Sequence, residues 1–278
     1  MYAQYTRRQG AIAYKHDLHL VAKMNLTILG CAGGIGGAER LTTCLLLDDD
    51  ILLDAGTGIS ELRMEELVRI NHIFLTHSHL DHVAGLPFLL DAVLDRRQGP
   101  VIVHASQSVI DTLNKHLFNW MLWPDFAVVP NAEHPVLHWE PLPPFARLGL
   151  GIRGITAYPV KHTVPSVAYL VDNGRAAFLF SGDMSSSPEM WAAVAGEPWI
   201  SKVIVDCSFP DAQSAIAQRS MHYSPRSLLE DIASLPSSIA LLVTHMKPGY
   251  EQLILQELRK GVADRPLDAL KRGDRLVF

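Results

Sequence analysis

Short apolar runs alternate along this chain with longer segments in which apolar residues recur every three or four positions. The short runs predict strands, and the longer periodic segments predict amphipathic helices. The predicted strands cover residues 25–30, 42–47, 51–54, 72–76, 101–104, 152–160, 166–171, 176–180, 202–205 and 239–243. The predicted helices cover residues 59–68, 83–94, 106–118, 188–195, 225–234 and 250–260. This alternation predicts an α/β fold.

Two parts of the chain lack this pattern. Between Trp120 and Arg153, prolines and aromatic residues replace the periodicity, which indicates irregular, loop-rich structure. Residues 1–23 lack the continuous apolar stretch of a secretory signal, and we interpret them as an N-terminal extension. We expect residues 24–278 to form a single domain. No apolar run reaches the roughly 18 residues needed to cross a bilayer, so we expect no membrane contact.

Composition narrows the class of protein. Of the 278 residues, 48% are hydrophobic and 19% are charged, a balance typical of a globular protein with a large core. The formal net charge of −5 provides no overall basic field, so we do not expect a nucleic-acid polymer as partner. The three cysteines are widely spaced and odd in number, which favours reduced core thiols and therefore a cytoplasmic location.

A glycine-rich segment follows the first predicted strand. Residues 30–37 contain five glycines, but their spacing is not the Gly-x-Gly-x-x-Gly of a dinucleotide-binding loop. The next predicted element is also a strand, whereas phosphate-binding loops open a helix. We therefore interpret this segment as a loop that needs a permissive backbone, without a nucleotide-binding role.

The segment after the strand at residues 72–76 is the most informative one. His77, His79, Asp81 and His82 lie within six residues. In an extended backbone, side chains two positions apart project to the same side, so His77 and His79 can bind one cation together. Asp81 and His82 lie beyond the turn, where they can reach a neighbouring cation. Imidazole and carboxylate ligands together suit a borderline divalent metal.

Two cations need more ligands than this segment offers. His162, Asp183 and His245 each follow a predicted strand. Because α/β proteins place functional groups at the carboxyl ends of their strands, we expect these three side chains to complete the site.

This ligand series, in this order, resembles that of the metallo-β-lactamase superfamily. The resemblance spans residues 25 to about 260 and implies an α/β fold of the four-layer αβ/βα sandwich type, with two mixed β-sheets. It implies two divalent metal ions, Zn²⁺ first, with Mn²⁺ or Fe²⁺ as alternatives. Position by position, it assigns His77, His79 and His162 to the first metal, Asp81, His82 and His245 to the second, and Asp183 to a bridge between them. Asp54 would support the site without binding metal.

Within the superfamily, the sequence is most similar to the class II 3′,5′-cyclic-nucleotide phosphodiesterases. The shared motifs are His-x-His-Leu-Asp-His-Val-Ala-Gly-Leu at residues 77–86, Phe-Asn-x-x-x-Trp-Pro at 118–124, Asp-Cys-Ser-Phe-Pro at 206–210, His-x-x-Pro at 222–225 and Thr-His-x-Lys-Pro at 244–248. Two residues depart from the family pattern, Asp91 in place of serine and Asp206 in place of glutamate.

The resemblance implies hydrolysis of cyclic AMP or cyclic GMP, a small-molecule partner, to the nucleoside 5′-monophosphate by a hydroxide bound between two metals. Asp81 would orient the hydroxide, and both His222 and a metal-bound water are candidates to protonate the leaving ribose oxygen. The aromatic faces of Trp120, Trp123 and Phe126 are candidates for base contact. A homodimer is a family expectation only.

Other activities on the same scaffold stay open. A transfer-RNA 3′ endonuclease shares the metal set but holds its RNA with a basic arm, whereas residues 101–160 here contain three Lys or Arg against four Asp or Glu. A thioester or lactone hydrolase is a further alternative, because the same metals hydrolyse carbonyl substrates. A metal-stapled binding module without activity is a different class, and the complete ligand set argues against it.

Overall fold

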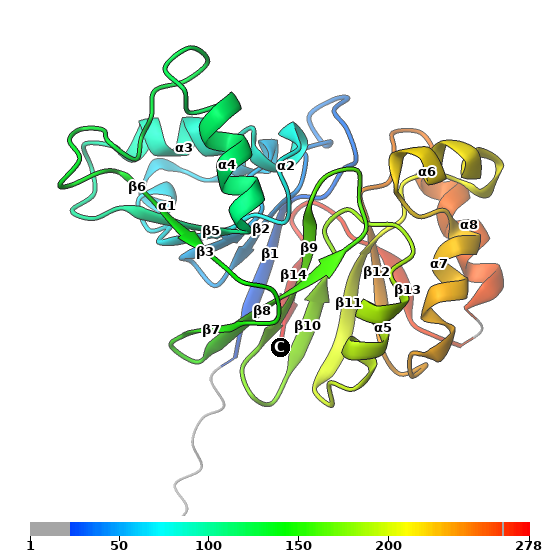
Figure 1. The fold of residues 1–278 in the computed structure, drawn as a ribbon. Coiled ribbons are helices and arrows are strands. Elements are labelled where there is room, and N and C mark those ends of the chain that lie inside the picture. Colours follow the sequence, from blue (N-terminus) through cyan, green and yellow to red (C-terminus); the bar gives the residue numbers. More distant parts are fainter. Residues whose placement is uncertain (1–22, 263) are drawn as a thin grey trace, which may run out of the picture.

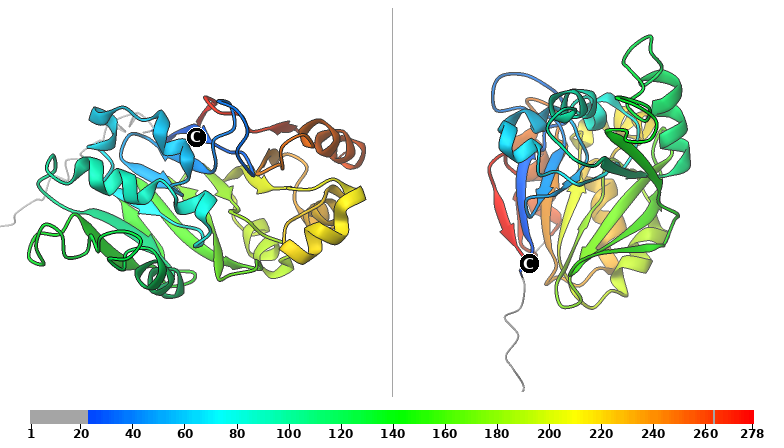
Figure 2. Two further views of the ribbon diagram at one scale, coloured as in Figure 1. Left: turned by 90° about the horizontal axis from the view of Figure 1, so that it is seen from above. Right: turned by 90° about the vertical axis from the view of Figure 1, so that its left-hand side faces the viewer.

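The computed structural model describes residues 23–262 and 264–278. The predicted N-terminal extension, residues 1–23, lies outside the described part of the chain except for Lys23. Figure 1 shows the fold, and Figure 2 shows it from above and from the side.

The described residues form two mixed β-sheets of seven strands each. The first sheet has the order β14-β1-β2-β3-β4-β5-β6, and the second has the order β13-β12-β11-β10-β9-β8-β7. The strands of the first sheet are β1 (Asn25–Gly30), β2 (Cys44–Leu47), β3 (Ile51–Leu53), β4 (His72–Phe74), β5 (Val101–Ala105), β6 (Leu137–Pro141) and β14 (Arg275–Val277). Those of the second are β7 (Arg147–Leu150), β8 (Arg153–Val160), β9 (Ser166–Asp172), β10 (Ala177–Phe180), β11 (Ile200–Asp206), β12 (Ala240–Thr244) and β13 (Leu267–Ala269).

Helices cover the outer faces of the two sheets (Figure 1). On the side of the first sheet lie α1 (Met64–Leu67), α2 (Leu80–Val83), α3 (Leu86–Val93) and α4 (Gln107–His116). On the side of the second sheet lie α5 (Pro188–Ala195), α6 (Ser214–Ser220), α7 (Pro225–Asp231) and α8 (Glu251–Gly261). Short 3₁₀ helices occupy Thr57–Glu61, Asp211–Gln213 and Ile232–Ser234. The predicted four-layer sandwich with two mixed sheets is confirmed.

The hydrophobic core shows why these strands form layers. Side chains alternate along β10, where Phe178 and Phe180 pack between the two sheets while Ala177 and Leu179 pack under the outer helices. One cluster of buried side chains thus fills the space between the sheets, and two further clusters join each sheet to its helices. A strand buried on both faces requires an apolar run rather than an alternating pattern, which is what the sequence shows.

Two predicted helices are shorter than the periodicity suggested. The helix predicted over residues 59–68 is broken at Leu62, where Arg63 donates its backbone N–H to the Glu66 carboxylate at 2.9 Å and starts α1. The helix predicted over residues 83–94 is split between α2 and α3, because Gly85 donates its N–H to the carbonyl of Ala55 at 2.8 Å instead of continuing the helix. Both breaks arise from contacts that apolar periodicity does not report.

The interpretation of residues 120–153 as irregular is wrong for β6 and β7, and β13, β14 and α6 were also not predicted. All four missed strands are the edge strands of the two sheets. Each has only one neighbouring strand and is largely exposed, so it lacks the apolar run that marks the central strands.

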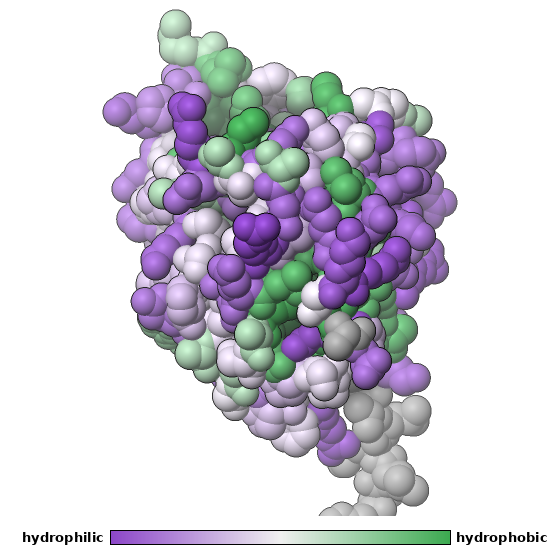
Figure 3. Space-filling view, turned by 90° about the vertical axis from the view of Figure 1, so that its right-hand side faces the viewer, coloured by the Kyte–Doolittle hydropathy of each residue, from purple (hydrophilic) through white to green (hydrophobic). Residues whose placement is uncertain are grey.

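Figure 3 shows the face that carries the outer helices of the second sheet, on which hydrophilic residues predominate and hydrophobic residues form small, separate patches. None of the helices described is long and apolar enough to cross a membrane.

A buried histidine in the first sheet makes the stability of the fold sensitive to pH. His104 on β5 stacks on Phe74 with ring centroids 4.4 Å apart, and its Nε2 lies 3.0 Å from Nδ1 of His72. Burial lowers the pKa of His104 to about 4, whereas the pKa of a histidine in the unfolded chain is about 6.5. The unfolded state therefore takes up the proton first, and stability present above about pH 6.5 is lost as the pH falls toward 4.

We expect the His104→Phe variant, which keeps the stacking on Phe74, to lose less stability on acidification than the wild type. Between pH 7 and pH 5 the difference in the free energy of unfolding should be about 1–2 kcal/mol. Urea unfolding of both proteins at the two pH values measures it. Equal losses in both proteins would contradict the assignment of this pH dependence to His104.

Candidate metal centre

The predicted ligands all lie where strands end. His77 and His79 follow β4, and Asp81 and His82 lie in α2, which begins directly afterwards. The other three follow strands of the second sheet, His162 after β8, Asp183 after β10 and His245 after β12. Seven side chains from both sheets thus meet at one end of the sandwich.

One group of ligand atoms surrounds a first cation position. Nδ1 of His79 lies 3.1 Å from Nε2 of His77 and 3.2 Å from Nε2 of His162. The Asp183 carboxylate lies 3.7 Å from Nε2 of His77 and 3.9 Å from Nε2 of His162. Three imidazoles and one carboxylate at this spacing match the tetrahedral ligand set that Zn²⁺ prefers.

A second group shares Asp183 with the first. Nε2 of His245 lies 3.1 Å from the Asp81 carboxylate and 3.3 Å from the Asp183 carboxylate. Nε2 of His82 lies 3.2 Å from the other oxygen of Asp183. Asp183 therefore stands between two sets of imidazoles, as a bridging ligand would.

Hydrogen bonds to the outer nitrogens fix which imidazole atom faces the centre. Nδ1–H of His77 donates to Thr76 Oγ1 at 2.9 Å, and Nδ1–H of His82 donates to the Asp54 carboxylate at 2.7 Å. Nδ1–H of His162 donates to the carbonyl of Met221 at 3.0 Å, and Nδ1–H of His245 donates to Ser208 Oγ at 3.0 Å. In each case Nε2 is left with a lone pair directed inward, the arrangement typical of metal-binding histidines.

Asp54 supports the centre from behind, as the resemblance implies. It is fully buried and accepts hydrogen bonds from the backbone N–H and the hydroxyl of Thr76, at 2.7 Å and 2.8 Å, besides the one from His82. Asp54 and His245 both have φ near +60°, a conformation that non-glycine residues rarely adopt. Such strain persists only where the surrounding structure holds it, and it is frequent at functional sites.

The residues fit a pair of cations. Among the described buried side chains, Nε2 of His82 and Oδ1 of Asp183 make no hydrogen bond, although both atoms point into the centre. Burial lowers the pKa of His77 well below its ordinary value, so its imidazole is neutral and can bind metal. Burial also opposes a charge on His82, yet the carboxylates of Asp183 and Asp54 raise its pKa well above the ordinary value, which shows that the centre favours added positive charge.

His222 lies beside the second group of ligands and is held by a carboxylate. Its Nδ1–H donates to Asp206 at 2.8 Å, and its ring stacks on that of His245 with centroids 5.2 Å apart. Although burial opposes it, the negative charge of Asp206 raises the pKa of His222. Ser208 donates its hydroxyl to the other oxygen of Asp206 at 2.7 Å, so one buried carboxylate orients both His222 and, through Ser208, His245.

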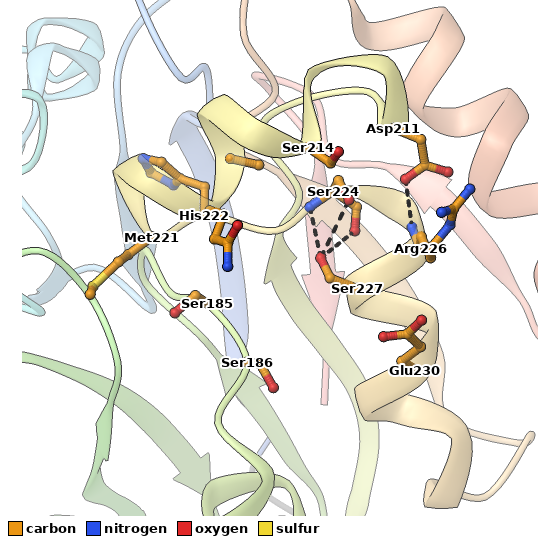
Figure 4. A pocket seen from close by; sticks show the side chains of 12 residues that line it. Ser185, Ser186, Asp211, Ser214, Met221, His222, Ser224, Arg226, Ser227 and Glu230 are labelled. Carbon is orange, nitrogen blue, oxygen red and sulfur yellow. Dashed lines mark hydrogen bonds between the residues drawn. The ribbon is translucent and has the colours of Figure 1, made fainter.

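A cleft of about 450 Å³ adjoins His222 (Figure 4). It lies between the loop that carries Ser185 and Ser186 and helices α6 and α7, and Met221 and Ser224 also contribute to its wall. Because the carbonyl of Met221 also accepts the hydrogen bond from His162, the residues between α6 and α7 separate the cleft from the first ligand group.

The predicted aromatic contacts do not gather at this centre as one set. Phe126 is only 2% exposed and packs in the core beneath the first sheet, so the prediction that it contacts a base is wrong. Trp123 packs on Phe88 with ring centroids 5.3 Å apart, and Trp120 is 63% exposed. For these two tryptophans, substrate contact stays a prediction.

Sequence reasoning did not assign a role to Asp206 or Ser208. Asp206 is the last residue of β11, and its position at a strand end is the same signal that singled out Asp183. The contribution of Met221 is made by its backbone carbonyl, which leaves no signal in the sequence.

One glycine is required by the close approach of two segments at the centre. A Cβ atom on Gly56 would lie 2.2 Å from the carbonyl oxygen of Asp81 and 2.5 Å from Thr42 Oγ1. We expect Gly56→Ala to lower the free energy of unfolding by about 1–3 kcal/mol, as overpacking does elsewhere, and to displace α2. Denaturant unfolding measures the loss. Gly99→Ala, whose Cβ would meet nothing within 4 Å, is the control, and an equal effect in both variants would contradict the steric argument.

Comparison with known proteins agrees with this geometry. The family model described as a beta-lactamase superfamily domain matches residues 49–246, and the chain belongs to this superfamily of metal-dependent hydrolases. The matched residues include all seven predicted ligands.

Several relatives carry the names of phosphodiester-cleaving enzymes. A probable 3′,5′-cyclic-nucleotide phosphodiesterase of Yersinia pestis is 25% identical over 299 residues, covering 86% of this chain and 84% of that protein. A ribonuclease Z of Parabacteroides distasonis is 26% identical over 160 residues, covering 54% of this chain and 50% of that protein. The crystal structure of unliganded yeast PDE1 is similar in fold, with a TM-score of 0.77 at 20% identity over 92% of this chain and 99% of that chain.

Proposed function

We propose that this protein hydrolyses 3′,5′-cyclic nucleotides, cyclic AMP or cyclic GMP, to nucleoside 5′-monophosphates. The observation that carries the proposal is the Asp206–His222 pair beside a complete set of ligands for two cations, a proton donor next to a centre suited to phosphoryl chemistry. The similarity to the Yersinia pestis protein over most of both chains supports the choice of substrate.

The ligand groups would hold two divalent ions, for which we propose Zn²⁺. When bound, such a pair supplies an activated water at neutral pH and stabilises the charge that develops on phosphoryl oxygens. The carboxylate of Asp81, which is partly exposed, lies 3.1 Å from Nε2 of His245 and would accept a hydrogen bond from the attacking water and orient it. The carboxylate of Asp183 lies between the two ligand groups and would bind both ions.

His222 is the residue that we propose protonates the leaving group. Because Asp206 accepts a hydrogen bond from Nδ1–H and stabilises the charged imidazole, Nε2–H of His222 can donate its proton to the ribose 3′ oxygen as the P–O bond breaks.

A ribonuclease Z activity is the second candidate, because relatives with that name match part of the chain. Both activities use the same metal centre, so they differ in what holds the substrate. The weak excess of acidic over basic residues in 101–160 favours a small cyclic nucleotide over transfer RNA.

The test is hydrolysis of cyclic AMP, cyclic GMP, a precursor transfer RNA, a thioester and a lactone by the zinc-loaded protein, with and without chelator, beside the His79→Ala variant. We expect turnover of a cyclic nucleotide that chelator and the variant both abolish. Cleavage of the RNA alone would replace the proposal by the endonuclease. Activity confined to a thioester or lactone would keep the metal centre and reject phosphodiester hydrolysis.

A further inference from the structure

Lys247 lies two residues beyond the predicted ligand His245, and hydrogen bonds hold both its backbone and its side chain. Its backbone N–H donates to the carbonyl of Ser208 at 3.0 Å, and its Nζ donates to the carbonyl of Gly33 at 2.8 Å. The side chain is half-buried. Across residues 23–262 and 264–278, no carboxylate pairs with this ammonium group, so its charge is not neutralised within the described chain.

The glycine-rich loop at residues 30–37 provides the carbonyl that holds Lys247. A Cβ atom on Gly33 would lie 2.1 Å from the carbonyl oxygen of His245 and 3.1 Å from Nδ1 of its ring. Only glycine lets the loop backbone approach the ligand this closely. The loop is further fixed because the N–H of His245 donates to the carbonyl of Cys31 at 2.9 Å.

One aromatic ring, that of Phe209, lies near both the ammonium group and His222. Nζ of Lys247 lies 5.9 Å from the centre of the Phe209 ring, and the same ring lies 6.0 Å from that of His222. A cation at this distance from an aromatic ring is attracted to it. Gly33, which packs against His245, and Phe209, which packs near His222, therefore link the ammonium group to both of these histidines.

We propose, resting on the function proposed above, that Lys247 is a substrate-binding residue that contacts a non-bridging phosphoryl oxygen, and that the glycine-rich loop serves to aim it. An ammonium group has three donors, and Gly33 uses one of them. The remaining donors and an unneutralised charge suit a phosphate anion, for which lysine acts as a point charge. The glycine-rich loop thus serves the phosphoryl group without being a nucleotide-binding loop.

The experiment compares Lys247→Met with Lys202→Met in the zinc-loaded protein. Lys202 is a matched control, because its ammonium group also lies against an aromatic ring, with Nζ 4.6 Å from the centre of the Phe278 ring. It lies near the start of β11, whereas Asp206, which holds His222, is at the other end of that strand. Calorimetry measures the binding of adenosine 5′-monophosphate and of inorganic phosphate. We expect Lys247→Met to raise both dissociation constants about ten- to a hundred-fold, the cost of losing a charged hydrogen bond, and Lys202→Met to change neither. Lys247→Arg should recover part of the affinity.

Metal content and thermal melting of each variant separate binding from folding. Unchanged affinity in a folded, zinc-loaded Lys247→Met protein overturns the proposal, and so does loss of zinc from both Lys247 variants, which would make the residue a support of the metal centre. If the wild type hydrolyses no cyclic nucleotide but Lys247→Met still weakens phosphate binding, the proposed function fails while Lys247 keeps its role. If cyclic nucleotides are hydrolysed and the variant retains the wild-type KM, only the role of Lys247 fails.

Discussion

Replacing Asp183 with asparagine is expected to lower kcat/KM for the phosphodiester substrate by about a thousand-fold or more. Loss of a residue that merely orients a metal ligand costs about ten- to a hundred-fold in comparable sites. The loss should be larger for Asp183, because its carboxylate lies within 3.9 Å of nitrogen atoms from both ligand groups and would itself bind metal. Asparagine keeps the shape of the side chain but loses the negative charge that both cations would share, so metal content should fall together with activity.

Steady-state kinetics and elemental analysis of the purified variant measure the two losses. Asp172→Asn is the matched control, because Asp172 pairs with Arg147 at 2.9 Å on the surface and is not a ligand. An Asp183→Asn protein that retains two metal equivalents and turnover within about tenfold of wild type would show that the carboxylate does not bridge.

The His222→Ala variant is expected to lose about a hundred- to ten-thousand-fold in kcat on a cyclic nucleotide while keeping its metal ions. The ring makes its hydrogen bond to Asp206 through Nδ1, so its removal takes away a proton donor and leaves the seven ligands in place. A ribose alkoxide is a poor leaving group and needs that proton, whereas p-nitrophenolate does not. The loss on bis(p-nitrophenyl) phosphate should therefore be below about tenfold.

This dependence on the leaving group distinguishes proton donation from a structural role. Equal losses on both substrates, or loss of metal from the variant, would assign His222 to support of the centre. Exposed His134 provides the control substitution, since His134→Ala should change neither rate.

The central strands of both sheets could be predicted from the sequence, whereas the edge strands could not. Strands such as β10 and β11 are buried on both faces, so their residues form apolar runs that are visible in the sequence alone. The four edge strands are β6, β7, β13 and β14, and their pairing depends on a single neighbouring strand, which for β6, β13 and β14 is distant in sequence, rather than on their own composition. The broken helices fail for a related reason, because Gly85 bonds to Ala55 across the fold.

The residues of the candidate site could be predicted from their chemistry rather than from periodicity. The seven ligands could be selected because His and Asp at strand ends are chemically conspicuous, and the structure brings all of them within reach of two cations. Residues that act through backbone carbonyls, such as Met221 and Gly33, cannot be recognised in this way, because the side chain gives no indication of the contact. Phe126 shows the opposite failure, since an aromatic residue between prolines can equally belong to the core.

The pairing of β14 with β1 has a consequence for biosynthesis. Asn25 lies opposite Val277, so the two strands that close this side of the first sheet are made some 250 residues apart. While the ribosome synthesises the chain, β1 has an unpaired edge until residues 275–277 emerge, and an open edge can pair with other chains. The nascent protein therefore carries an open strand edge, at which it can aggregate, for as long as β14 is missing from the first sheet.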